Sequence, residues 1–235
     1  VLSFSPPDQA RDQWLKRAGG EASSQLARVR EQLFAPLEIE RHHLILDIEA
    51  GTGLLSWEAL RRVPEGGVWA HASDKTSAVA LREIATHLPE LERPVVLQGP
   101  LLRLEEQIAE RATELETAPA DVRFDVVVGR NALGPLAAKT DIAAILCRHL
   151  APGGRLSLVE TLSHRSQRLH VLVDLEDLGT DLAGRLVAAE ESIYADTDNP
   201  QVNWDVEDLA KLCADAGLNQ VHTRVDSQLS QRHIA

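Results

Sequence analysis

The chain has 235 residues, of which 44% are hydrophobic, and its 36 acidic and 24 basic side chains give a formal net charge of −12. This length suits one α/β domain with a short extra segment, and no apolar run approaches the roughly 20 residues that a membrane helix requires. The acidic balance argues against direct nucleic-acid binding by this domain, since that function needs clustered Lys and Arg. We therefore expect a soluble, cytoplasmic globular protein.

Residues 1–40 have the pattern of a helical N-terminal extension. Asp8 follows Ser-Pro-Pro and can cap a helix, and apolar residues from Trp14 to Leu33 fall at helical spacing, interrupted at Gly19 and Gly20. The pattern changes near residue 40, so we expect a second domain over residues 41–235.

From residue 41 the chain alternates strand and helix patterns. Strands are expected at 43–48, 68–72, 94–98, 124–129, 155–160 and 221–225, and helices at about 54–63, 77–88, 102–116, 139–150, 166–175, 181–191 and 205–216. Such alternation implies right-handed crossovers and a mostly parallel sheet. The predicted fold class is α/β: a Rossmann-like, doubly wound sheet of six to seven strands with helices on both faces, the last strand beginning around 227–234.

The most informative segment is LILDIEAGTGLL, residues 44–55. An apolar strand ends in an acid, passes through a loop that contains Gly51 and Gly53, and continues as an apolar helix. The segment resembles motif I of the class I S-adenosylmethionine (SAM)-dependent methyltransferases. Residues 124–133 are similar to the fourth strand and following loop of that family, and residues 150–156 to the turn before its fifth strand. Three motifs in the family's order imply its fold.

The resemblance also implies a cofactor site for SAM or its product S-adenosylhomocysteine. Asp47 matches the acid that lies near the methionine part of SAM, and Gly51 and Gly53 match two of the three motif glycines. The residues themselves leave other roles open, because Asp47 can brace the loop or cap a helix and the glycines can simply form a tight turn.

Three positions depart from the family pattern. Glu49 replaces the first motif glycine, and it can either contact the ligand or fill the site. The acid expected at the end of the second strand aligns with Ala72, so Asp74 is a candidate substitute. After the third strand, Pro100 occupies the position where the family has an acid, so Gln98 is the nearby polar group. Each missing charged hydrogen bond would weaken ligand binding by roughly 1.5–3 kcal/mol.

The acceptor side of the site is predicted less sharply. Arg130 and Asn131 follow the fourth strand, where the family places substrate-facing groups, although Asn131 can equally be a loop-bracing amide. Glu160, His164 and Tyr194 could line an acceptor pocket. No catalytic acid or base is identified, because methyl transfer depends mainly on alignment. The histidines show no metal-ligand spacing, and Cys147 and Cys213 are interpreted as reduced core thiols.

A closer resemblance concerns residues 57–69, 129–133, 193–196 and 202–204. They resemble the methyltransferase-like domain appended to some bacterial AAA+ ATPases of the replication-associated recombination family. The chain begins at Val1 and contains no methionine, as expected for an excised domain or for a sequence from which methionines were omitted. Two functions therefore remain open: a SAM-dependent methyltransferase with an unknown acceptor, or a non-catalytic interaction module of an attached ATPase. A NAD site is disfavoured because the glycine spacing is wrong.

Overall fold

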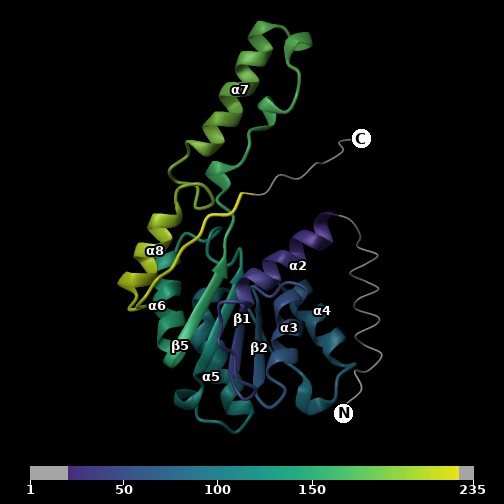
Figure 1. Cartoon of the computed structure of the whole chain (residues 1–235), viewed down its shortest axis with the longest axis vertical. Helices are drawn as coiled ribbons and strands as arrows, with labels where there is room; N and C mark the ends of the chain where they lie inside the picture. Colours follow the sequence, from purple (N-terminus) through teal and green to yellow (C-terminus); the bar gives the residue numbers. More distant parts are fainter. Residues whose placement is uncertain (1–20, 228–235) are drawn as a thin grey trace. The chain divides into compact units, whose positions relative to one another are not determined.

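The computed structural model describes residues 21–227, and its centre is one sheet of five parallel strands (Figure 1). The strand order is β3-β2-β1-β4-β5. The strands are β1 (Leu44–Ile48), β2 (Gly67–Ala72), β3 (Val95–Gln98), β4 (Phe124–Arg130) and β5 (Leu150–Val159). This arrangement confirms the Rossmann-like α/β fold class. All four strand pairings are parallel, as expected when helical crossovers connect the strands.

The prediction of six to seven strands was wrong, because the described residues form five. The segment expected as a sixth strand is not a strand, and its end residues Val221 and Val225 are 36% and 48% exposed. A strand at a sheet edge is stable only when its backbone pairs and its apolar side chains are covered. Neither condition is met here. Most of the segment predicted to begin a seventh strand lies outside the described residues.

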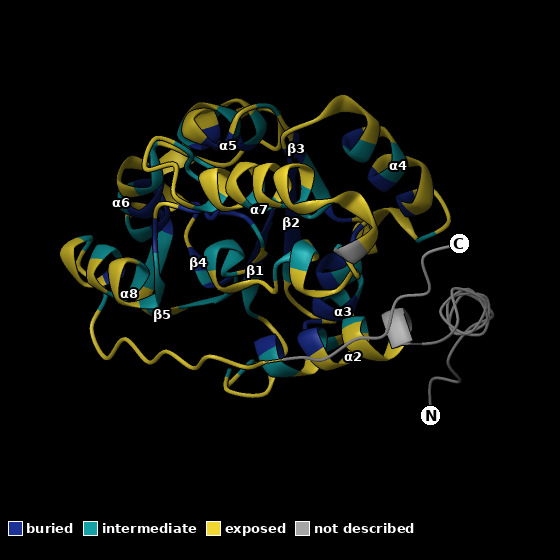
Figure 2. Ribbon diagram, turned by 90° about the horizontal axis from the view of Figure 1, so that it is seen from above, coloured by how far each residue is buried: buried dark blue, intermediate teal, exposed yellow. Residues whose placement is uncertain are grey.

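Helices cover both faces of the sheet (Figure 2). They are α3 (Leu54–Arg62), α4 (Lys75–Ala85), α5 (Leu104–Glu114) and α6 (Lys139–His149). After β5 come α7 (Thr180–Tyr194), which buries no residue, and α8 (Val206–Asp215). Short 3-10 turns are η1 (Glu90–Glu92), η2 (Leu101–Arg103), η3 (Pro119–Asp121), η4 (Ser163–Arg165), η5 (Leu169–Val171) and η6 (Glu176–Leu178). The larger core packs α5 and α6 against residues such as Leu46, Trp69 and Val127. A smaller core packs α4 against β2 through Ala70, Ala72 and Leu81. Successive residues of β1 thus face the helices on opposite sides of the sheet, and Asp47 faces α3.

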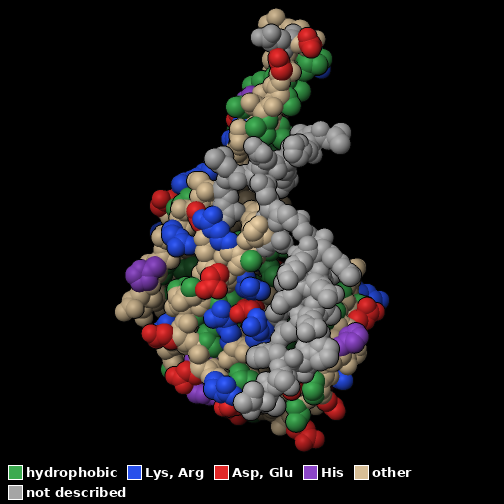
Figure 3. Space-filling model, turned by 45° about the vertical axis from the view of Figure 1, so that its right-hand side comes forward, with side chains coloured by type: hydrophobic (Ala, Val, Ile, Leu, Met, Phe, Trp, Pro, Cys, Tyr) green, Lys and Arg blue, Asp and Glu red, His purple; other side chains and the backbone are tan. Residues whose placement is uncertain are grey.

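The segment between β5 and α7 also differs from the prediction. We expected a helix at 166–175, but the only helical turn within these residues is η5. The backbone N–H groups of Leu169 and His170 donate to the Glu190 carboxylate at 2.6 and 2.9 Å, so a side chain of α7 replaces the acceptors that a helix would have used. α7 has no buried residue, and hydrophobic side chains gather along this segment in Figure 3.

The chain divides into two compact units, one from Ile39 to Arg224 and one that joins residues 21–38 to the last described residues. In the second unit, Asp226 accepts hydrogen bonds from Arg28 at 2.5 Å and Gln32 at 2.6 Å, both on helix α2 (Glu21–Phe34). The predicted Asp8 cap lies outside the described residues, and the predicted domain boundary near residue 40 stays a prediction. Across residues 21–227 we find no helix with the length and apolar content needed to cross a membrane.

Candidate functional site

The strand order places a topological switch point between β1 and β4. The chain progresses from β1 through β2 to β3 on one side and from β4 to β5 on the other. Ligands of open α/β sheets bind outside the carboxyl ends of the strands at such a point, because the loops leave it in opposite directions. The loop after β1, residues 49–53, and the loop after β4, residues 131–138, border this point. We define these two segments as the β1 loop and the β4 loop.

Asp47 lies beneath the β1 loop and is fully buried. Its Oδ2 accepts a hydrogen bond from Ser56 Oγ of α3 at 2.5 Å, while its Oδ1 has no hydrogen-bond partner. Burial raises the pKa of Asp47 to about 7, and the hydrogen bonds from Ser56 only partly oppose this. The structure therefore gives Asp47 a bracing contact to the first turns of α3, which is one of the two roles that the sequence left open.

Glu49 adopts a left-handed backbone conformation with φ of 54°. Its side chain reaches the end of β2, where its carboxylate accepts hydrogen bonds from the Ser73 hydroxyl and from the Ser73 backbone N–H, the latter at 3.4 Å. The carboxylate is a quarter exposed. It thus bridges the β1 loop to Ser73, the residue that follows Ala72 at the end of β2.

His71 is a polar residue at the site that sequence reasoning missed. It is fully buried in β2, its Nε2 lies 2.8 Å from the carbonyl oxygen of Gly99, and its Nδ1 has no hydrogen-bond partner. Burial lowers the pKa of His71, so its ring is neutral near pH 7 and Nε2 carries the proton. The 3.6 Å contact between Nδ1 and Glu49 Oε1 is therefore not a salt bridge. The sequence did contain a signal for this residue, because a histidine stands within the apolar run Val68–Ala72.

The two glycines of the β1 loop both have positive φ values, 55° for Gly51 and 88° for Gly53. A Cβ on Gly51 would meet no atom within 4 Å, whereas a Cβ on Gly53 would lie 2.4 Å from Trp57 Nε1. Gly53 is therefore required by internal packing. Gly51 faces open space, and within residues 21–227 the N–H groups of Gly51 and Thr52 have no protein partner.

Asp74 and Gln98 both lie on the β2–β3 side of the sheet and already have partners. Asp74 is the N-cap of α4 and accepts a hydrogen bond from Ser77 N at 2.8 Å, which lowers the pKa of Asp74. Gln98 accepts one from Arg82 at 3.2 Å. Both residues thus accept a hydrogen bond from a residue of α4, and their predicted contacts with a cofactor stay predictions.

The β4 loop is closed by a side chain from the end of β5. The Glu160 carboxylate accepts hydrogen bonds from three consecutive backbone N–H groups, those of Ala132, Leu133 and Gly134, at 2.9–3.0 Å. Burial raises the pKa of Glu160, while these donors act in the opposite direction. A concave run of N–H groups is an anion-binding shape, and here the protein fills it with its own carboxylate.

Asn131 begins the β4 loop with φ of 51°, and its Oδ1 accepts hydrogen bonds from Thr161 N and Thr161 Oγ1 at 3.0 and 2.9 Å. These contacts match the loop-bracing alternative for Asn131. Arg130, just before it, is exposed at the end of β4. Arg130 and Asn131 thus lie at the end of β4 and the start of the β4 loop, and their predicted contact with an acceptor stays a prediction.

The remaining acceptor-side candidates, His164 and Tyr194, lie on the segment beyond β5. His164 Nε2 lies 3.1 Å from Asp205, the N-cap of α8, and the Arg168 guanidinium stacks 3.6 Å from the centroid of the Tyr194 ring. Both side chains have local partners, so their predicted place in an acceptor pocket stays a prediction.

Comparisons with known proteins identify the fold through structure. No protein-family model matches the chain, and no curated protein matches its sequence. A proposed methyltransferase from Bacillus halodurans C-125 shares 19% identity and a TM-score of 0.51, covering 83% of this chain and 68% of its own length. A proposed sarcosine dimethylglycine methyltransferase from Galdieria sulphuraria shares 15% identity and a TM-score of 0.51, covering 92% of this chain and 67% of its own. The chain therefore has the fold found in these methyltransferases.

Proposed function

We propose that this chain is a SAM-dependent methyltransferase domain with the cofactor bound over the β1 loop. The observation that carries the proposal is the conformation of this loop at the switch point. Glu49, Gly51 and Gly53 all have positive φ, and the N–H groups of Gly51 and Thr52 have no partner among residues 21–227. Such a loop, followed directly by the first turn of α3, offers backbone donors to a polar ligand. The fold shared with known methyltransferases favours SAM among nucleotide ligands.

Within this proposal, each residue has a distinct task. Asp47 holds the start of α3 through Ser56, and Gly51 permits close approach of the ligand. The Glu49 carboxylate, which reaches Ser73 at the end of β2, accepts hydrogen bonds from the ligand. SAM supplies an activated methyl group on a sulfonium. The chain's own contribution is alignment of the acceptor near the β4 loop, where Arg130 is exposed.

Calorimetric titration with SAM and with S-adenosylhomocysteine tests the proposal. We expect saturable binding of one ligand per chain, and no comparable heat with NAD. The matched variant is Gly51→Ala, which adds a Cβ that meets no protein atom within 4 Å and so weakens binding through the ligand contact or the left-handed backbone. Absence of heat with both SAM and its product at millimolar concentration would contradict the proposal.

One observation favours a second function, a non-catalytic interaction module. The Glu49 side chain occupies the space between the β1 loop and Ser73 that a nucleoside would approach. If it blocks the site, Glu49→Gly creates or tightens SAM binding, because glycine also removes the strain of a positive φ. If Glu49 instead contacts the ligand, both Glu49→Gly and Glu49→Gln weaken binding. We propose the second outcome.

The setting beside a replication-associated AAA+ ATPase remains a proposal from the resemblance of residues 57–69, 193–196 and 202–204. Neither of the two structures that share the fold is described as part of an ATPase. Copurification of an ATPase subunit with this domain from its natural host is the corresponding test.

A further inference from the structure

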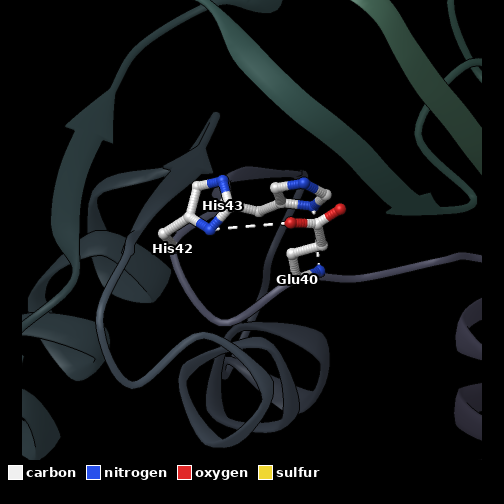
Figure 4. A group of neighbouring side chains, drawn as sticks. All are labelled: Glu40, His42 and His43. Carbon is white, nitrogen blue, oxygen red and sulfur yellow. Dashed lines mark hydrogen bonds and ion pairs between the residues drawn. The ribbon is translucent and has the colours of Figure 1, made fainter.

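A cluster of three potential metal ligands lies in the turn before β1. Glu40, His42 and His43 each offer one ligand atom, and these atoms lie within 4.8 Å of one another. Figure 4 shows the His42 ring and the Glu40 carboxylate facing each other, with Nδ1 and Oε2 separated by 3.7 Å. Neither the fold nor the proposed methyl transfer requires this juxtaposition.

The backbone of this turn is fixed by neighbouring structure. His43 N donates to Glu40 O at 3.1 Å and closes the turn, and Gly67 N donates to His43 O at 3.2 Å where β2 begins. The Arg41 guanidinium pairs with Glu65 at 2.8 Å, and this contact balances the positive charge nearest to the cluster. The three ligand side chains therefore start from a held backbone, which reduces the entropy lost when an ion orders them.

The ligand types indicate which ion would bind. Two imidazoles and a carboxylate suit Zn²⁺, Ni²⁺ or Cu²⁺, whereas Mg²⁺ and Ca²⁺ prefer oxygen ligands. In a tetrahedral zinc site with bonds of about 2 Å, ligand atoms are roughly 3.3 Å apart. The 3.7 Å separation of His42 Nδ1 from Glu40 Oε2 needs only a small closure. His43 Nδ1 accepts a hydrogen bond from Glu40 N at 3.2 Å, so coordination through that nitrogen replaces this bond.

We propose that Glu40, His42 and His43 form a transition-metal site that binds Zn²⁺ or Ni²⁺ with three protein ligands and water. The site precedes β1, whereas the β1 loop follows it. The five residues of β1 separate the two by about 16 Å. The metal site is therefore independent of the proposed cofactor site, and failure of one proposal leaves the other unaffected.

The experiment is a calorimetric titration of tag-free, chelator-treated full chain with Zn²⁺ and with Ni²⁺. We expect one ion per chain, and no comparable binding of Mg²⁺ or Ca²⁺. His42→Asn and His43→Asn should each weaken affinity roughly tenfold or more, because each removes one of three ligands, and Glu40→Gln should weaken it less. His222→Asn is the matched control, since His222 is an exposed histidine outside the cluster.

The absorption of bound Co²⁺ gives a second readout that reports ligand number directly. We expect an intense visible band from a site of low coordination number in the unmodified chain, and loss of that band in the double variant His42→Asn/His43→Asn. Circular dichroism of the metal-free proteins checks that the variants fold. The proposal is overturned if the unmodified chain binds no Zn²⁺ or Ni²⁺, or if the double variant binds them within about twofold of the unmodified affinity.

Discussion

The β1 loop and the β4 loop border the same switch point, but they differ in whether their backbone N–H groups are hydrogen-bonded within the protein. In the β4 loop, three consecutive N–H groups are bonded to the Glu160 carboxylate. In the β1 loop, the N–H groups of Gly51 and Thr52 have no partner within the described residues, and the carboxylate of Glu49 in the same loop is directed to Ser73. A loop closed by its own acid is a structural element, whereas a loop with free donors has the capacity to bind a ligand.

The largest effect is expected from Gly53→Ala, which attacks the packing of the β1 loop. The added Cβ would lie 2.4 Å from Trp57 Nε1 and 2.8 Å from Leu81 Cδ2, at a backbone φ of 88°. Left-handed strain and overpacking together should lower the free energy of unfolding by roughly 2–4 kcal/mol. Urea denaturation measures this loss. A loss below about 1 kcal/mol would show that the Trp57 ring moves aside easily.

Glu160→Gln should have the next largest effect, because it opens the β4 loop. The amide retains one acceptor oxygen but turns a donor toward backbone N–H groups, which leaves at least one buried donor unpaired. We expect the free energy of unfolding to fall by roughly 1.5–3 kcal/mol. Glu83→Gln, an exposed change on α4, is the control and should be nearly neutral. If Glu160→Gln and Glu83→Gln lower the free energy of unfolding by the same small amount, the Glu160 carboxylate does not stabilise the β4 loop and the two loops do not differ in this respect.

Asp47→Asn should alter the pH dependence of stability. Because the pKa of folded Asp47 is about 7, above the ordinary 3.8, the unmodified protein loses stability as pH rises from about 4 to about 7. The amide cannot ionise, so the stability of the variant relative to the unmodified protein should rise by roughly 2–3 kcal/mol between pH 5 and pH 8. Thermal unfolding across this range measures the difference.

The control for that experiment is Asp74→Asn, whose effect has the opposite sign. The pKa of Asp74 is lowered by its cap contact with Ser77, so its charged form stabilises the fold above its ordinary pKa and this contribution is lost as pH falls. The same pH trend for both variants would argue that Asp47 does not titrate as a buried acid.

The smallest stability effect is expected from Gly51→Ala, which sharpens the assignment of a ligand role. Its Cβ would meet no atom within 4 Å, so the loss should be limited to left-handed strain of about 1 kcal/mol. If the β1 loop binds SAM, the affinity should fall by more than this strain accounts for, and the comparison with Gly53→Ala separates the two roles. Equal stability losses for Gly51→Ala and Gly53→Ala in urea denaturation would contradict the assignment of different roles to the two glycines.

Much of the fold was predictable from residues that are neighbours in the sequence. The runs that became β1 and β4 are short, buried and rich in Val, Ile and Leu, and turn residues separate them from helices with clear periodicity. The same local reasoning failed at 166–175 and 221–225. In the first segment, Glu190 of α7 supplies the acceptors, and in the second no strand among residues 21–227 pairs with the backbone.

The sequence by itself determined the α/β class, the position of the glycine-containing loop and the candidates Asp47, Gly51 and Gly53. The class and the loop depend on periodicity and on backbone preference, which are local properties, whereas the three candidates follow from the resemblance to motif I of the methyltransferase family. Only the tertiary structure decided that Glu49 reaches Ser73, that His71 is buried with an unpaired Nδ1, and that Glu160 closes the β4 loop. The contact of Glu49 with Ser73 joins residues 24 positions apart, and that of Glu160 with Leu133 joins residues 27 positions apart. Their partners are therefore set by strand order and register, which no local pattern encodes.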